Sequence, residues 1–184
     1  MPLSPEELEL LRAHAAVHEA AHAVAALELG LPLDHVAMAG DGINPRTGAY
    51  TNFGQYEAWR LMEERPNDMA PMSLAGTSAE NYFFNSSIRD GATVDMQIIG
   101  SAGGAPSDDP AEVMEWLQPW VDQTRAIVRE KRDAIETVAV ALMSTDRLSR
   151  AEIEELVERS NTEPVHLLGH LTPVWRVPEQ PEAR

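Results

Sequence analysis

The pattern of apolar and polar positions predicts a mainly α-helical protein, and its clearest element lies near the N-terminus. Alanines and aliphatic residues follow one another up to Leu29, without a glycine before Gly30, which is typical of a long helix. Ser4, Pro5 and Glu7 fit the N-cap, the first helical position and the third position of a capping box. We therefore expect one helix from Pro5 to about Leu29, ended by Gly30.

Helical spacing and capping residues predict further helices along the chain. They are expected at residues 55–64, 71–85 and 91–99, in a long amphipathic helix from Trp120 to about Met143, and in a last helix capped by Ser149 and Glu152. Asp109 and Pro110 should start another helical segment, which Pro119 should break or kink. Residues 100–106, rich in glycine, are expected to be the most flexible internal segment.

Two short segments have an extended pattern, at residues 33–39 and 48–53, and the residues between them favour turns. They predict a small β-hairpin or a pair of edge strands. An edge strand can hold an extended peptide by adding it as a further strand, so Gly48, Ala49, Tyr50 and Thr51 are candidate substrate-binding residues. A hairpin that merely connects two helices explains the composition equally well.

Composition and charge narrow the functional classes. The chain has 184 residues, enough for one domain at residues 1–160, and residues 161–184 hold four prolines and should form a Pro-rich tail. The formal net charge of −16 disfavours nucleic acids and anionic membranes as partners. Cysteine is absent, which excludes disulfides and thiolate metal ligands. No apolar run is long enough to span a membrane, and the acidic N-terminus does not resemble a secretory signal, so a cytoplasmic protein is expected.

The candidate chemistry lies within the first predicted helix, which contains the motif H-E-x-x-H at His18, Glu19 and His22. Histidines four positions apart point the same way on a helix and can supply two ligands of a zinc ion. Glu19 is offset by about 100°, where it can act as general base on a zinc-bound water. The alternative is an ordinary pair of histidines on an alanine-rich helix, although chance predicts only about 0.02 such motifs in this chain.

A catalytic zinc site usually takes three protein ligands, so a third is needed. Asp95, in the first turn of a short predicted helix, and Glu80, within a helix rich in small residues, are the candidates. His166 and His170 are also four residues apart, but the prolines and glycine around them argue against a second metal site. His14 lies one turn before His18 and could be a ligand partner, a spare ligand or, as we favour, an ordinary polar residue.

Four segments in order resemble the peptidase domain of the FtsH-type ATP-dependent zinc metalloproteases. They are AVHEAAHAVAAL at residues 16–27, GAYT at 48–51, LAGTSAEN at 74–81 and DGATVDMQ at 90–97. The segment LSRAEIEELVE is similar to the closing helix of that domain, so the resemblance covers about residues 11–158. It implies a single mainly helical FtsH-like domain, with Asp95 as third zinc ligand and Glu80 orienting a ligand histidine.

The chain departs from the family pattern at several points. Ala21, Asn81 and Val94 replace residues usual in the family, and the glycine-rich residues 100–104 interrupt a segment that is usually helical. There is also no G-x-x-x-x-G-K-[ST] motif and hence no AAA+ module. These departures leave the candidate zinc-binding residues intact, but the ATPase module that unfolds substrates in the family is missing.

The expected function is therefore that of a zinc-dependent metalloendopeptidase, a hydrolase that cleaves extended or unfolded polypeptides with Glu19 as general base. The alternative is a non-catalytic or partner-dependent subunit that contains zinc, binds peptides and works with a separately encoded AAA+ ATPase. An intact Glu19 favours the first, because a purely structural zinc site needs no general base.

Overall fold

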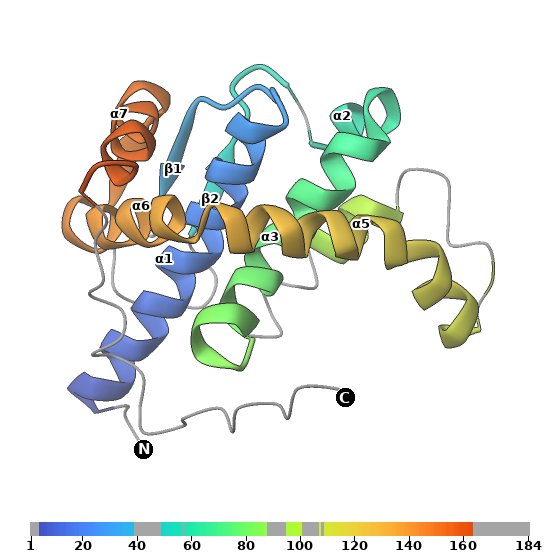
Figure 1. Ribbon diagram of the computed structural model, residues 1–184, viewed down its shortest axis with the longest axis horizontal. Coiled ribbons are helices and arrows are strands. Elements are labelled where there is room, and N and C mark those ends of the chain that lie inside the picture. The colour runs from blue at the N-terminus through green and yellow to red at the C-terminus, as the bar shows by residue number, and fades with distance from the viewer. Residues whose placement is uncertain are drawn as a thin grey trace.

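The computed structural model is mainly helical with one small antiparallel sheet, as predicted (Figure 1). It describes residues 4–38, 49–56, 58–87, 95–100, 107 and 109–163. The helices are α1 (Pro5–Glu28), α2 (Ala58–Glu64), α3 (Pro66–Phe84), α5 (Pro110–Glu130), α6 (Arg132–Thr145) and α7 (Arg150–Ser160), and residues 95–100 are also helical. The strands are β1 (His35–Ala37), β2 (Tyr50–Asn52) and β3 (Arg147–Ser149).

Some predictions fall outside the described residues. They concern Gly48, residues 91–94 and 101–106, and the tail with His166 and His170. The division into a domain at 1–160 and a tail at 161–184 therefore stays a prediction. Within the described ranges, every helix is too short or too polar to cross a lipid bilayer.

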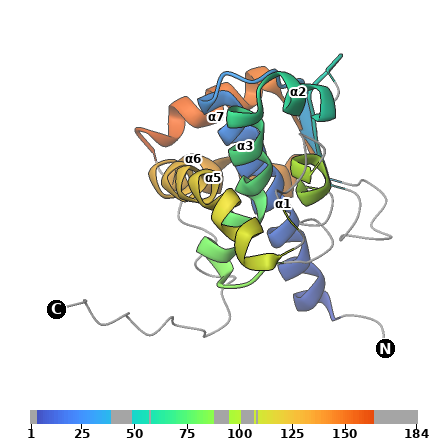
Figure 2. The same cartoon turned by 90° about the vertical axis from the view of Figure 1, so that its right-hand side faces the viewer.

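Helix α1 is the central element of the fold, and α3, α6 and the sheet pack around it (Figures 1 and 2). It begins with the predicted capping box, in which Ser4 and Glu7 each accept a hydrogen bond from the other's backbone N–H. It ends as expected, because Gly30 takes a φ of +62°, a conformation that costs other residues free energy. The carbonyls of Leu29 and Gly30 accept hydrogen bonds from Arg65, which satisfies acceptors left free at the helix end.

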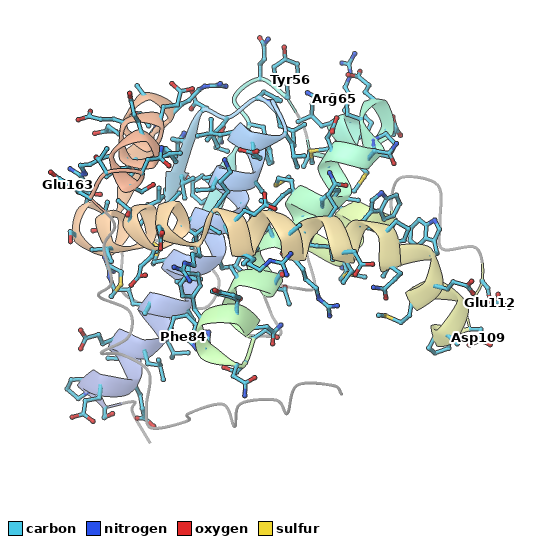
Figure 3. All side chains as sticks on the ribbon, viewed as in Figure 1. Tyr56, Arg65, Phe84, Asp109, Glu112 and Glu163 are labelled. Carbon is cyan, nitrogen blue, oxygen red and sulfur yellow. The ribbon has the colours of Figure 1, made fainter. Side chains whose placement is uncertain are left out.

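The predicted boundaries of α3 and of the long amphipathic helix are wrong. Helix α3 begins at Pro66, not at residue 71, because a proline is accommodated in the first turn and the helix then continues through Pro71. The expected helix from 120 to 143 is two helices that meet at Lys131, which leaves helical geometry with a φ of −102° and a ψ of 16°. Helix α5 starts at its N-cap Asp109 (Figure 3) and runs on through Pro119, which does not break it.

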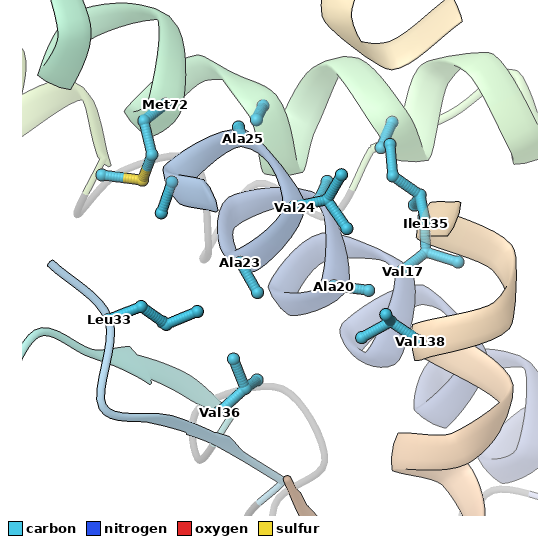
Figure 4. Packing of buried hydrophobic residues seen from close by; sticks show 14 of the residues in the cluster. Val17, Ala20, Ala23, Val24, Ala25, Leu33, Val36, Met72, Ile135 and Val138 are labelled. Atoms are coloured by element: carbon cyan, nitrogen blue, oxygen red, sulfur yellow. The ribbon is translucent and has the colours of Figure 1, made fainter. Parts of the chain in front are cut away.

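The core lies on the faces of α1 that meet its neighbours (Figure 4). Val17 and Val24 are buried there, among side chains such as Ile135 and Val138 of α6. Each fully buried valine of this kind contributes about 1.5–3 kcal/mol relative to an exposed one. Most other core positions of α1 are alanines, including Ala20, which let the neighbouring helices approach closely. The helix that carries the H-E-x-x-H motif is therefore held from several sides.

The sheet has the strand order β2–β1–β3, and both strand pairs are antiparallel. Val36 of β1 lies opposite Thr51 on one side and Leu148 on the other. The predicted antiparallel pair is thus confirmed, with β2 at the edge, but β1 is central because of β3, which was not predicted. Only Leu148 in β3 is apolar and buried, and Ser149 also serves as the N-cap of α7, so the sequence pattern there indicates a helix start.

Candidate metal centre

The side chains of the H-E-x-x-H motif lie on the buried part of α1. His18, Glu19 and His22 are each 5–7% exposed. The two imidazole rings follow one another on one side of the helix, with their centroids 4.6 Å apart and their planes at 78°. This is the arrangement that two histidines on one helical face should have. Burial of three ionisable side chains on one turn costs free energy unless each has a polar partner.

Asp95 brings a carboxylate to the two imidazoles from the helical residues 95–100. Its Oδ2 lies 3.1 Å from Nε2 of His18 and 3.4 Å from Nε2 of His22. One potential ligand atom from each of the three residues lies within 4.8 Å of the other two. The His18, His22 and Asp95 side chains therefore form a group that could hold a metal ion.

The other ring nitrogen of each histidine is held by α3. Nδ1 of His18 lies 2.6 Å from Oε1 of Glu80, and Nδ1 of His22 lies 2.8 Å from the carbonyl oxygen of Met72. Both acceptors favour the tautomer with a proton on Nδ1, which leaves Nε2 free to bind a metal. Glu80 lies on the far side of the His18 ring from Asp95, where it can orient this histidine.

His14 belongs to the same network, through a contact with the carboxylate that also contacts His18. It is 6% exposed, and its Nδ1 lies 3.0 Å from Oε2 of Glu80. Its ring stacks on Phe84, near the end of α3 (Figure 3), with 4.0 Å between the centroids. One carboxylate of α3 thus contacts two imidazoles of α1. The spacing of His14, four residues before His18, was the sequence signal for this contact.

A glycine of α3 makes room for the His18 ring. A Cβ atom added to Gly76 would lie 2.5 Å from Nε2 of His18 and 2.6 Å from two ring carbons. Real Cβ atoms essentially never make contacts this short. Gly76 belongs to the segment that the sequence shows to be rich in small residues, and the group that fills the space beside it is a candidate metal ligand.

Glu19 is held by the edge strand of the sheet. The Thr51 hydroxyl donates a hydrogen bond of 2.8 Å to Oε2 of Glu19. Among the four candidate substrate-binding residues, Thr51 therefore contacts the centre directly. Successive side chains of a strand alternate between its faces, and the neighbouring Tyr50 contacts His35 instead, with its hydroxyl 3.4 Å from Nε2. Ala49 comes just before the strand.

The charges of the centre are coupled. Burial lowers the pKa of His18, but hydrogen bonds with Asp95 and Glu80 outweigh burial and raise it to about 10. Burial also lowers the pKa of His22, but the charge of Asp95, a hydrogen bond with Asp95 and the charge of Glu19 together outweigh burial and raise it. Burial raises the pKa of Asp95, but the two imidazoles outweigh burial and hold it well below its usual range. The site therefore favours the protonated form of both imidazoles beside the Asp95 carboxylate, and a metal ion bound to Nε2 would take the place of the Nε2 protons.

The donor set fits a zinc ion. Two imidazole nitrogens and one carboxylate oxygen are ligands that Zn²⁺ accepts, and catalytic zinc sites commonly have three protein ligands. The partners on Nδ1 of both histidines are those that metal-ligating histidines almost always have. Other divalent ions accept the same donors.

No protein-family model matches the sequence, and no curated protein matches it either. The function is therefore inferred from the residues of the centre and from their contacts.

Proposed function

We propose that this protein is a zinc-dependent metalloendopeptidase of extended polypeptides, related to the FtsH-type peptidase domains. The observation that carries the proposal is that Nε2 of His18 and Nε2 of His22 converge on Asp95, while Glu19 on the same helix is fixed by Thr51. A purely structural metal site needs no glutamate at that place.

The four segments behind the family resemblance supply this one centre. The first contains His18, Glu19 and His22, the second Thr51, the third Glu80 and the fourth Asp95. They are far apart in the sequence, yet each contributes a contact within hydrogen-bonding distance. These contacts support the proposal that the four segments serve one peptidase site.

In the proposed reaction, His18, His22 and Asp95 would hold the zinc ion. When bound, zinc would polarise the scissile carbonyl and make a water molecule acidic enough to lose a proton near neutral pH. Glu19 would accept that proton and pass it to the leaving amine. The Thr51 hydroxyl donates a hydrogen bond to Oε2 of Glu19 and so helps to hold this carboxylate in position.

The edge strand favours an extended peptide as substrate. Among the described strands, β2 pairs only with β1, so its other edge has no partner strand. A peptide added to that edge uses backbone hydrogen bonds, which do not depend on sequence. Because Thr51 belongs to this strand and contacts Glu19, a peptide bound there would lie beside the general base.

The test combines metal analysis with cleavage of an unfolded substrate, β-casein. The wild type should contain about one zinc per chain and cleave casein. Glu19→Gln should keep the zinc and lose about 10²–10⁴-fold in rate, because the amide cannot accept the proton. Glu9→Gln, an exposed change on the same helix, is the matched control and should cleave normally.

Normal cleavage by Glu19→Gln would disprove the proposed mechanism. A zinc-loaded wild type that binds casein without cleaving it would favour the non-catalytic or ATPase-dependent subunit instead. A protein that takes up no zinc would disprove both.

A further inference from the structure

A groove lies between α3 and α5, which pack against each other and cross in Figure 1. Its volume is about 540 Å³, within the range of ligand-binding clefts. The residues of α3 that line it, among them Leu74 and Asn81, are not those that contact the metal centre, which are Met72, Gly76 and Glu80. The groove is therefore separate from the candidate metal centre.

The floor of the groove is apolar. Leu74 from α3 and Val121 and Val128 from α5 line it. Met114 and Tyr82, also in the lining, are 53% and 47% exposed. Large apolar side chains with this much exposure, gathered at one groove, indicate a surface that binds another molecule. Methionine is well suited to such a surface because its flexible side chain adapts to different partners.

Two arginines on one side of the groove stand out in this acidic chain. Arg125 and Arg129 both line it and lie one helical turn apart on α5. In the described part of the chain, neither forms an ion pair with a carboxylate. The cations that do are Arg12, Arg60, Arg65, Lys131, Arg132 and Arg150. Like charges at this spacing repel each other on a helix, so an anion placed between them would be stabilised.

We propose that this groove binds an acidic amphipathic helix of a partner protein. Leucine-like side chains of the partner would enter the apolar floor, and carboxylates one turn apart on the partner would face Arg125 and Arg129, since both helices have the same rise per turn. With a net charge of −16, most of the surface repels such a helix, so the two arginines decide where it docks. This inference is independent of the proposed peptidase activity.

The experiment uses the whole protein and a fluorescein-labelled peptide of about 18 residues, with leucines at positions i, i+3, i+4 and i+7 and glutamates beside them. Binding is measured by fluorescence anisotropy. Arg125→Gln/Arg129→Gln should weaken binding about tenfold or more, and added salt should weaken wild-type binding. The matched control is Arg147→Gln/Arg159→Gln, which changes the net charge equally at two exposed arginines that do not line the groove and have no ion pair within the described residues. It should bind the peptide normally.

Two further peptides are measured in the same way. A peptide with lysines in place of the glutamates tests the role of charge. A peptide with the leucines and glutamates in scrambled order tests the role of amphipathicity at the same overall hydrophobicity. Equal binding of the lysine or the scrambled peptide would overturn the proposal. So would equal loss in the two double variants, or the absence of binding to the wild type. A wild type that is dimeric, while Arg125→Gln/Arg129→Gln is monomeric, would assign the groove to a second copy of this chain instead. Zinc content should be the same in all variants.

Discussion

Oε1 of Glu80 lies 2.6 Å from Nδ1 of His18, and Oε2 of the same carboxylate lies 3.0 Å from Nδ1 of His14. One side chain of α3 thus fixes two imidazoles that are one turn apart on α1. Because Nδ1 of His18 is engaged in this way, only Nε2 can face Asp95 and a metal ion. Glu80 is the candidate positioning residue of the centre, and Asp95 is the candidate third ligand.

The first prediction separates these two roles. Asp95→Asn should lower zinc affinity more than Glu80→Gln, because it weakens a direct ligand, whereas a change to the partner of a ligand typically costs 10–100-fold. Zinc affinity is measured by competition with a chromophoric chelator. If Glu80→Gln were the more damaging change, the two roles would have to be exchanged.

A second prediction concerns the space that Gly76 leaves for His18. Gly76→Ala should lower the free energy of unfolding by about 1–3 kcal/mol and weaken zinc binding, because the added Cβ would displace the imidazole. Gly100→Ala is the matched control, since a Cβ at that glycine meets nothing within 4 Å. Urea unfolding and zinc titration of both variants check this. Equal behaviour of the two would show that the His18 ring can move without cost.

Thr51 provides a third prediction, which depends on the proposed function. Thr51→Val removes the hydroxyl that fixes Glu19 while keeping the shape of the side chain, and it should lower kcat roughly 10- to 100-fold with little change in KM. Thr51→Ser keeps the hydroxyl and should restore most of the rate. A KM effect without a kcat effect would place Thr51 in peptide binding alone.

The fourth prediction is a pH dependence of the metal-free protein. The unfolded chain loses the His18 proton near pH 6.5, whereas the folded protein keeps it to about pH 10. Between these values the folded state binds more protons, so stability should fall as the pH rises through this window. For Asp95, whose pKa is lowered, the contribution is present above pH 3.8 and is lost as the pH falls below it.

The corresponding measurement is the Tm in the presence of a chelator between pH 5 and pH 10, in parallel with His18→Gln. The variant should show a flatter decline above pH 6.5. Zinc should raise the Tm of the wild type most at the alkaline end, because fewer protons compete for the ligands there. A Tm of the metal-free wild type that rises toward pH 10 would contradict the coupling between His18 and its carboxylate partners.

The sequence predicted those structural features that are formed by residues close together in the chain. The capping boxes of Ser4 and Ser149 involve residues three positions apart, and both are confirmed. The break at Lys131 was not predictable in this way, since the apolar spacing continues across it and no proline or glycine marks it. Strand β3 was equally hidden, because three residues pair with β1 only through the tertiary fold.

The same distinction applies to the centre. His18, Glu19 and His22 are recognisable because the motif is contained in one helix. The contact between Thr51 and Glu19, and that between Met72 and His22, join residues 32 and 50 positions apart. No spacing rule predicts such pairs, and a backbone carbonyl such as that of Met72 leaves no trace in the sequence at all. Residue types alone left Asp95 and Glu80 as candidates for the third ligand, and the family resemblance favoured Asp95.

The alanines of α1 have a consequence for how this protein can change. Ala20 and Ala21 are completely buried beside the motif residues, and a larger side chain there would shift the backbone from which His18 and His22 project. Substitutions that have no effect on a surface helix would therefore mostly be harmful at the buried positions of α1. For the same reason, α1 with its H-E-x-x-H motif cannot be grafted onto another protein by itself. The host protein would also need the surfaces of α3 and α6 that pack against this helix.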